Sequence, residues 1–237
     1  DHDIMDSDDT RRNMPTVHRK YDVPSAILAG DGIFTISQLI LGTIQNNSNH
    51  LLQKYNEMVL EICEGQALDN QFEGVDKLNL DDYIEMVKKK TGALLGACLS
   101  LPAIISNENS EKVNELYDAG KSLGVGFQIH DDIFEIFGEE SIIGKSLGSD
   151  ISSNKNTAIA IVAKERNKVD WSNLTNQFDG KDLYKIRKFL EENNVKTKVE
   201  SIADSYFSSA FKSLKNLEID EKNELYGFFK MIQERSY

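Results

Sequence analysis

The sequence has few cysteines, few prolines and no excess of basic charge, and each scarcity excludes a class of protein. Its 237 residues include 2 cysteines, 3 prolines and 1 tryptophan, and their formal net charge is -12. Cys63 and Cys98 stand alone in apolar helical runs, which favours buried small side chains in a reducing compartment over a disulfide or a metal site. The negative charge repels phosphate backbones, so we expect no nucleic-acid partner.

Long uninterrupted hydrophobic runs are also missing. No run reaches ~18 apolar residues, the length of a membrane-spanning helix. The most apolar stretch, residues 91–105, contains Gly, Ser and Pro102 and predicts a buried helix. No signal peptide is visible. We therefore expect a cytoplasmic protein without a transmembrane segment. The sequence starts at Asp1 without Met and inside a motif, so we expect the natural chain to continue upstream.

Alternating strand patterns are scarce, and helical periodicity dominates. From Leu51, apolar residues recur in steps of three and four, which places them on one helix face. Start signals predict four long helices, over residues 22–44, 48–72, 79–105 and 110–137, and shorter ones near 156–164, 181–193, 195–214 and 220–234. Residues 138–154 are rich in Gly and Ser, and 165–180 read as polar and irregular. Long helices with short connections predict an all-α, single-domain antiparallel bundle over residues 1–237.

A first acidic cluster opens the chain. His2 and Asp6 are separated by four residues and Asp3 and Asp6 by three, so a helix would bring these side chains within reach of one cation. Carboxylate oxygens suit Mg²⁺, which takes its remaining ligands from water and substrate phosphates. Arg11 and Arg12 follow, and their planar guanidinium groups match diphosphate oxygens.

A second acidic cluster lies at the end of the fourth predicted helix. Asp131 and Glu135 are again four residues apart, and Asp132 adds a third acid. One acidic helix face is usually only a solvated surface. Two such clusters, each followed by basic residues, favour a metal–diphosphate site. Carboxylates next to Ile133 and Phe134 are costly to desolvate, and a metal ion would offset that cost.

The basic residues downstream are less specific. Lys145 and Lys155 lie in a glycine-rich stretch that lacks the spacing of a P-loop, but could close over a bound diphosphate. None of the four histidines is spaced as a zinc ligand or as part of a catalytic triad. We expect each histidine to be structural or exposed.

Together these segments resemble the trans-prenyl diphosphate synthase family, the farnesyl and geranylgeranyl diphosphate synthases, most closely their archaeal and bacterial short-chain members. Its first motif appears as His2-Asp3-Ile4-Met5-Asp6 followed by Arg11-Arg12, and its second as Gly126-Phe127-Gln128-Ile129-His130-Asp131-Asp132-Ile133-Phe134-Glu135. Further matching segments, in the right order, are Leu28-Ala29-Gly30-Asp31, Gly65-Gln66-Ala67-Leu68-Asp69, Lys90-Thr91-Gly92-Ala93-Leu94, Gly144-Lys145, Gly148-Ser149-Asp150-Ile151 and Lys155-Asn156-Thr157.

The resemblance implies a fold, a reaction and a set of roles. The fold would be that of isoprenoid synthases, with a deep apolar cavity, and the enzyme would be a homodimer. It would join isopentenyl diphosphate to an allylic diphosphate with Mg²⁺, giving geranylgeranyl or farnesyl diphosphate. Mg²⁺ would be held by Asp3, Asp6, Asp131, Asp132 and Glu135. The allylic diphosphate would be gripped by Arg11, Lys90, Lys145 and Lys155, isopentenyl diphosphate by Arg12, and the reacting centre lined by Thr91, Phe127 and Gln128.

Three departures from the family pattern matter. His2 stands where the first motif has its leading Asp, and histidine is a poorer Mg²⁺ ligand. Glu135 replaces the last Asp of the second motif but keeps a carboxylate. The family's N-terminal helices, which carry part of the isopentenyl diphosphate site, are not represented before Asp1.

These departures leave two alternatives open. A non-catalytic partner subunit of a heteromeric synthase would share the fold, although it would not need so many diphosphate ligands. A terpene cyclase would share the fold and the first motif. It would normally carry a different second metal motif, and this makes it the weaker alternative.

Overall fold

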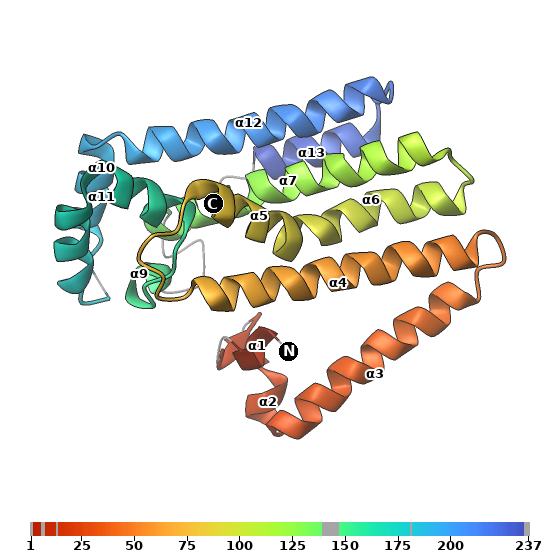
Figure 1. The fold of residues 1–237 in the computed structure, drawn as a ribbon, viewed down its shortest axis with the longest axis horizontal. Helices are drawn as coiled ribbons and strands as arrows, with labels where there is room; N and C mark the ends of the chain where they lie inside the picture. The colour runs from red at the N-terminus through yellow and green to blue at the C-terminus, as the bar shows by residue number, and fades with distance from the viewer. Residues whose placement is uncertain (1, 6–7, 13, 139–146, 181, 235–237) are drawn as a thin grey trace. The chain divides into compact units, whose positions relative to one another are not determined.

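The structure, a computed structural model, describes residues 2–5, 8–12, 14–138, 147–180 and 182–234. Within these residues the only strands are β1 (Thr10–Arg11) and β2 (Met14–Pro15), an antiparallel pair in which Thr10 lies opposite Pro15. The remaining elements are helices, so the all-α prediction is confirmed (Figure 1). The chain divides into two compact units, Asp1–Gln53 and Lys54–Tyr237.

The first unit contains α1 (His2–Met5), the β1–β2 pair, α2 (Val17–Lys20) and α3 (Val23–Gly42). The predicted start of α3 is confirmed, because the Asp22 side chain accepts a hydrogen bond of 2.6 Å from the Ser25 amide. Pro24 occupies the first turn, where its missing N–H leaves no helical hydrogen bond unmade. The helix ends at Gly42, slightly before the predicted end at residue 44.

Helix α3 is much more apolar than the sequence analysis recognised. Leu28, Ile33 and Leu39 are each about two-thirds exposed (70%, 69% and 67%). By length and composition α3 could cross a membrane, although only 6% of it is buried. Polar residues such as Asp31 interrupt its apolar run, which is why a search for uninterrupted runs missed it. Core helices of soluble proteins and signal sequences have the same length and composition, so these two properties do not decide what covers α3.

The second unit holds most of the helices, and its first residue, Lys54, lies inside α4. Its elements are α4 (Ser48–Phe72), α5 (Leu80–Val87), the π-helix η1 (Lys88–Gly92), α6 (Ala93–Ile105), α7 (Ser110–Phe137), α9 (Ser149–Ser152), α10 (Ala158–Asn176), α11 (Tyr184–Glu192), α12 (Val195–Asn216) and α13 (Glu224–Gln233). Helix α7 packs against α6 and against α12, as Figure 1 shows.

The α6–α7 contact depends on glycines that let the two backbones meet. A Cβ atom added to Gly120 would lie 2.6 Å from the Gly96 Cα atom, and one added to Gly124 would lie 2.7 Å from the Gly92 Cα atom. Such distances leave no room for any side chain. Gly92 and Gly96 are therefore residues of close helix packing.

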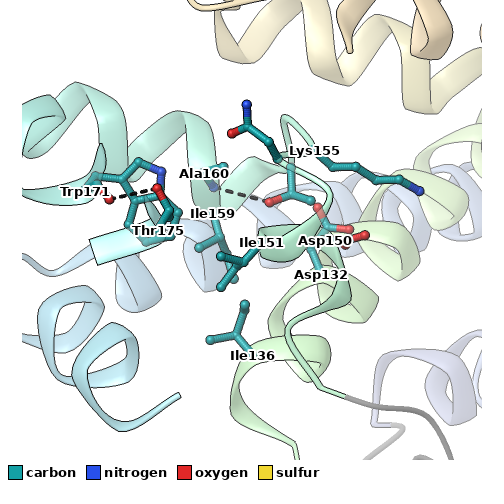
Figure 2. A pocket seen from close by; sticks show the side chains of 11 residues that line it. Asp132, Ile136, Asp150, Ile151, Lys155, Ile159, Ala160, Trp171 and Thr175 are labelled. Atoms are coloured by element: carbon teal, nitrogen blue, oxygen red, sulfur yellow. Dashed lines mark hydrogen bonds between the residues drawn. The ribbon is translucent and has the colours of Figure 1, made fainter. Parts of the chain in front are cut away.

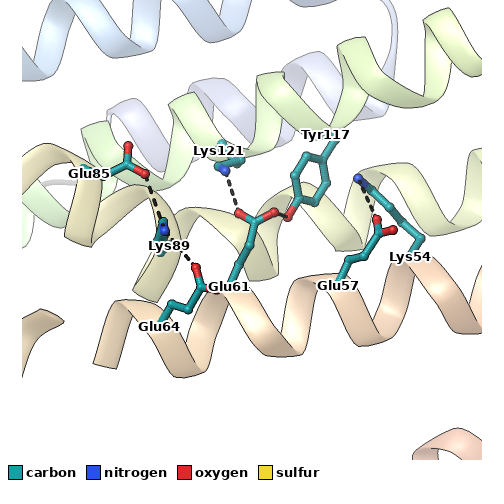
Figure 3. Close-up of polar contacts among 8 residues, drawn as sticks. All are labelled: Lys54, Glu57, Glu61, Glu64, Glu85, Lys89, Tyr117 and Lys121. Carbon is teal, nitrogen blue, oxygen red and sulfur yellow. Dashed lines mark hydrogen bonds and ion pairs between the residues drawn. The ribbon is translucent and has the colours of Figure 1, made fainter. Parts of the chain in front are cut away.

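Polar side chains tie α4 to α7 in the same unit. Glu61 on α4 accepts hydrogen bonds from the Tyr117 hydroxyl (2.8 Å) and from Lys121 Nζ (2.6 Å), both on α7 (Figure 3). Lys54 Nζ lies 3.8 Å from the centroid of the Tyr117 ring, within range of a cation–π interaction. These contacts lie beside a small apolar cluster of Met58, Ala93, Ala97 and Tyr117.

Several predicted boundaries are confirmed and others are wrong. Asn79 caps α5, since its side chain accepts a 2.8 Å hydrogen bond from the Asp82 amide. Helix α7 begins at Ser110, as predicted, and the side chain of the preceding residue, Asn109, caps it. The prediction of an irregular segment over residues 165–180 is wrong up to residue 176, because α10 runs on to Asn176 through one non-helical residue, Asn167 (φ -156°, ψ 88°). Helices α11 and α13 begin later than predicted, at Tyr184 and Glu224.

The prediction of two buried cysteines is wrong. Cys63 on α4 and Cys98 on α6 are both exposed. Their helices bury other residues, such as Met58 on α4 and Ala97 on α6. Cys98 follows Ala97 directly, so it is turned ~100° away from the buried face of α6. An apolar run on a helix covers more than one face, and residue type alone did not identify the face that packs.

Candidate active site

A cavity of about 110 Å³ lies in the second unit, where α4, α5, η1 and α7 meet the segment before α10. Twelve residues line it: Asp69, Tyr83, Met86, Val87, Lys90, Thr91, Gln128, Asp132, Asp150, Lys155, Asn156 and Thr157. Lys90, Thr91, Gln128, Asp132 and Lys155 were predicted site residues, so residues from distant parts of the sequence meet here as expected. The lining combines basic and acidic groups with apolar side chains.

Lys90 reaches the cavity from the π-helix η1. Such wide turns are rare and are frequent at functional sites. A Cβ atom added to Gly65 would lie 2.3 Å from the Lys90 backbone nitrogen, so α4 approaches η1 too closely for any side chain at that position. One turn along α4, Asp69 accepts a hydrogen bond of 2.5 Å from Lys90 Nζ. Gly65 and Asp69 therefore act together: one permits the approach and the other orients the lysine.

Asp132 is a buried carboxylate, 6% exposed, at the inner end of the cavity. Its Oδ2 atom accepts hydrogen bonds from the Tyr83 hydroxyl (2.6 Å) and the Ala158 amide (3.2 Å), and Oδ1 accepts one from Gln128 Nε2 (3.2 Å). Burial raises the pKa of Asp132 to about 6, even though these hydrogen bonds act in the opposite direction. The site therefore holds a carboxylate that lacks a compensating positive charge.

Glu135 and Asp150 form a pair of neighbouring acidic side chains. Glu135 Oε1 accepts hydrogen bonds of 2.7 Å from the Ser149 hydroxyl and from the Asp150 amide. Burial, and then the neighbouring Glu135, raise the pKa of Asp150 well above that of an ordinary aspartate. Burial alone would raise the pKa of Glu135 too, but hydrogen bonds from Asp150 and Ser149 lower it. A proton retained by Asp150 would relieve the repulsion between the two groups.

The acids of the site lie against an apolar wall. A smaller cavity of about 10 Å³ shares Asp132, Asp150, Lys155 and Thr157 with the larger one, and its lining includes apolar side chains such as Ile136 and Trp171. Figure 2 shows Asp132 and Asp150 close together, with the Lys155 side chain extending past them. This wall keeps water from the carboxylates, which explains the direction of their pKa shifts.

The other predicted site residues on α7 do not line either cavity. Phe127, Asp131 and Glu135 are half-buried, and they are absent from the lining of both cavities. Their predicted roles remain predictions. His130 packs edge-on against Phe134 and Phe207, with ring centroids 5.8 and 4.8 Å away.

The first acidic cluster lies in the first unit, at its N-terminal end. Arg11 Nη1 donates a hydrogen bond of 2.7 Å to Asp3 Oδ1, so a predicted diphosphate-binding residue and a predicted metal ligand pair with each other. Arg12, next to it, adopts a left-handed conformation (φ 52°) and is exposed. Asp6, Lys145 and the side chain of His2 lie outside the described residues.

The sequence analysis gave no role to several residues of the cavity, among them Asp69, Tyr83 and Asp150. Asp69 and Asp150 belong to segments that resemble the family, but no role was given to either. Tyr83 gave no polar signal, because it fits the apolar face of α5 along with Ile84 and Val87. Only the fold brings its hydroxyl to Asp132, which is 49 residues away in the sequence.

The donor set fits Mg²⁺ even though the described residues include no group of three or more His, Cys, Asp or Glu with the arrangement of a metal site. Mg²⁺ is usually bound by one or two carboxylates, with water and substrate phosphates as its other ligands. Asp132 supplies such a carboxylate. A nearby cation would stabilise its charged form against the burial that raises its pKa.

Comparison with known proteins agrees with this geometry. The model of the polyprenyl synthetase family matches residues 2–200. The chain belongs to the polyprenyl synthetase family. The resemblance inferred from the sequence motifs is therefore confirmed.

The family includes relatives with described products. A short chain isoprenyl diphosphate synthase of Methanocaldococcus jannaschii is 40% identical over 163 residues, which cover 68% of this chain and 50% of the relative. A geranylgeranyl diphosphate synthase of Sulfolobus acidocaldarius is 31% identical over 235 residues, 95% of this chain and 71% of the relative. The match spans about half the length of the first three curated relatives (50%, 49% and 52%).

Solved structures confirm the isoprenoid synthase fold. The crystal structure of a geranylgeranyl pyrophosphate synthase matches with a TM-score of 0.92 and 29% identity, covering 100% of this chain and 76% of the other. The enzyme of that class from Pyrococcus horikoshii matches with a TM-score of 0.88 and 32% identity, covering 99% of this chain and 74% of the other.

Proposed function

We propose that this polyprenyl synthetase is a prenyltransferase that condenses isopentenyl diphosphate with an allylic diphosphate. The observation that carries the proposal is the cavity in which Lys90 and Lys155 stand with the buried carboxylate of Asp132. An anionic substrate is otherwise hard to reconcile with a chain of net charge -12. The names of the relatives support geranylgeranyl diphosphate as the product. The resemblance seen in the sequence motifs gives farnesyl diphosphate as the next candidate.

The residues of the cavity fit the needs of this reaction. Lys90 and Lys155 would neutralise the allylic diphosphate as it leaves, which favours breaking of the carbon–oxygen bond. The Thr91 hydroxyl donates a 3.2 Å hydrogen bond to Gln128 Oε1. In the proposed reaction these two side chains would line the reacting centre. The released diphosphate would accept the proton that is lost after condensation. This reaction needs no acid–base side chain of its own.

Mg²⁺ is part of the proposal. When bound, it would supply positive charge that stabilises the leaving diphosphate. Asp132 would hold one such ion with Asp131 and Glu135, and Asp3 and Asp6 would hold another, as predicted from the sequence. Arg11 and Lys145 would add to the grip on the allylic diphosphate, and Arg12 would bind isopentenyl diphosphate.

A homodimer and a cytoplasmic location complete the proposal. The exposed apolar side chains of α3 support an association between copies of the chain, because contiguous exposed apolar surface is unusual on a monomer. The size of the particle in solution, measured by light scattering, tests this part of the proposal. A monodisperse monomer at micromolar concentration would contradict it.

A non-catalytic partner subunit remains the second candidate. His2, in place of the leading Asp of the first motif, favours it. The two candidates differ in turnover. The purified protein, given Mg²⁺, isopentenyl diphosphate and an allylic diphosphate, should release inorganic diphosphate and form a longer prenyl chain. Binding of diphosphate without turnover would favour the partner subunit, and a cyclic hydrocarbon product would favour a terpene cyclase.

A further inference from the structure

Tyr83 places a phenol hydroxyl deep in the second unit, against the carboxylate that the proposed reaction needs. The side chain lies on α5 and is 2% exposed. Its hydroxyl donates a hydrogen bond of 2.6 Å to Asp132 Oδ2, and this is the shortest of the three hydrogen bonds that Asp132 accepts. Because hydrogen bonds to a charged acceptor are the strong ones, this contact dominates the orientation of the carboxylate.

The two oxygen atoms of Asp132 are held unequally. Oδ2 accepts from Tyr83 and from the Ala158 amide, both from elements outside α7. Oδ1 accepts only the longer bond from Gln128, which is itself a half-buried residue of the cavity. Oδ2 is therefore anchored to the scaffold, and Oδ1 is the oxygen with capacity left for a cation or its water ligands.

The donor that anchors Oδ2 is also rigid. The Tyr83 ring belongs to the main apolar core, with Ile84, Val87 and Ile129 in the same cluster. A tyrosine has only two side-chain torsions, and packing of the ring leaves its hydroxyl little freedom. The hydroxyl is therefore held against Oδ2 of Asp132.

We infer that Tyr83 is a positioning residue for the prenyl transfer: it fixes the Asp132 carboxylate so that Oδ1 is presented to a divalent cation and the diphosphate that it carries. This inference rests on the proposed function. It differs from a purely structural role, in which the hydroxyl would only satisfy a buried polar atom and its loss would affect stability alone.

The test uses two matched tyrosine-to-phenylalanine variants. Tyr83→Phe removes the hydroxyl that bonds to Asp132. Tyr117→Phe removes a hydroxyl that bonds to Glu61 at 2.8 Å, at the α4–α7 contact and outside the lining of both cavities (Figure 3). The measurements are the calorimetric affinity for inorganic diphosphate in the presence of Mg²⁺, the Mn²⁺ affinity read by electron paramagnetic resonance, and the thermal midpoint of unfolding.

We expect Tyr83→Phe to weaken the binding of Mg²⁺–diphosphate and of Mn²⁺ about tenfold, as loss of a hydrogen bond to a charged group would. Tyr117→Phe should leave both affinities unchanged, although both variants lower the unfolding midpoint. In an Asp132→Asn background the effect of Tyr83→Phe on affinity should disappear, since Tyr83 acts through the Asp132 carboxylate.

Three results would overturn the inference, and they are distinguishable. If the wild-type protein binds Mg²⁺–diphosphate and Tyr83→Phe binds it equally well, Tyr83 is only structural and the proposed function stands. If the wild-type protein binds neither Mn²⁺ nor Mg²⁺–diphosphate, the proposed function fails and the role of Tyr83 fails with it. An equal loss of affinity in the Asp132→Asn background would also show that Tyr83 does not act through Asp132.

Discussion

At the scale of single residues, the site contains charged side chains, and some of them have no partner of opposite charge among the residues that the structure describes. Lys90 pairs with Asp69, but Asp132 is buried among neutral donors. Burying such a carboxylate costs stability unless a positive charge compensates it. The raised pKa of Asp132 records that cost. A divalent cation would bring the missing positive charge. The free site is therefore arranged for its ligand and not for stability.

Neighbouring lysines on η1 give a direct test of this arrangement. Lys90 lines the cavity, whereas Lys89 pairs with Glu64 (2.8 Å) and Glu85 (3.8 Å) and does not line it. We predict that Lys90→Met weakens binding of inorganic diphosphate with Mg²⁺ about 10- to 100-fold, because a hydrogen bond to a charged group is lost.

Lys89→Met is the control for this substitution, and it should change that affinity less than twofold, by about 0.4 kcal/mol at most. Titration calorimetry measures both variants under the same conditions. Equal effects of the two substitutions would show that net charge on η1, and not the position of Lys90, governs binding.

The acidic pair predicts an unusual pH dependence of stability. The pKa of Asp150 is raised in the folded state, so the folded protein holds a proton that the unfolded chain releases. Stability should therefore fall as pH rises from the ordinary aspartate range toward the raised pKa, with a slope of up to about 1.4 kcal/mol per pH unit. The side chain introduced by Asp150→Asn can still donate a hydrogen bond to Glu135, and it carries no titrating proton. The stability of this variant should therefore fall less as the pH rises.

Urea unfolding in EDTA at about pH 7 and pH 8 measures this slope. Asp76→Asn is the control, because Lys168 lowers the pKa of Asp76 and its contribution is lost only in acid. That variant should keep the wild-type slope in this range. An unchanged slope in Asp150→Asn would contradict the assignment of a retained proton to Asp150.

At the scale of the elements, η1 and the glycine that faces it position the site. The Cβ atom of Gly65→Ala would lie 2.3 Å from the Lys90 nitrogen, and backbone atoms cannot move aside as a flexible side chain would. We predict that Gly65→Ala lowers the free energy of unfolding by about 1–3 kcal/mol and weakens diphosphate binding, because η1 must shift.

Gly227→Ala in α13 is the control for this substitution. No atom lies within 4 Å of its added Cβ atom, and alanine in a helix interior should raise stability by up to about 1 kcal/mol. Chemical denaturation and calorimetry measure both quantities. A Gly65→Ala protein with wild-type stability and affinity would show that α4 and η1 are not held at this distance.

The sequence predicted most helix starts because capping is local. Asp22 and Asn79 bond to backbone amides three residues later, as their residue types predict. Features that depend on distant contacts were missed. The segment 165–176 lacks apolar periodicity, yet it is helical after the break at Asn167, whose side chain accepts from the Asp170 amide (3.2 Å). Nothing in the local sequence of η1 predicts its wide turn.

In the candidate site, too, some residues could be predicted from the sequence and others depend on distant contacts. The resemblance to the family predicted Lys90, Thr91, Gln128, Asp132 and Lys155, and all five line one cavity. The partners that orient them come from other elements: Asp69 for Lys90, and Tyr83 for Asp132. Their roles depend on how α4 and α5 pack, which single residue types do not encode.

At the scale of the whole molecule, the family and the fold are shown, and the reaction is the central proposal. Each unit carries part of the predicted chemistry: Asp3 and Arg11 belong to Asp1–Gln53, and the lysines and acids of the cavity belong to Lys54–Tyr237. The proposal therefore requires both units in the protein that is assayed. A preparation of the second unit alone should bind Mg²⁺–diphosphate more weakly than the whole chain does.

The most direct test is a product assay. The purified protein is incubated with Mg²⁺, isopentenyl diphosphate and an allylic diphosphate, and the prenyl alcohols are identified after dephosphorylation. We predict one discrete product of geranylgeranyl or farnesyl length, lost when EDTA removes the metal. A protein that binds Mg²⁺ and diphosphate but forms no product from an allylic diphosphate would contradict the prenyltransferase assignment. That result would favour a non-catalytic partner subunit.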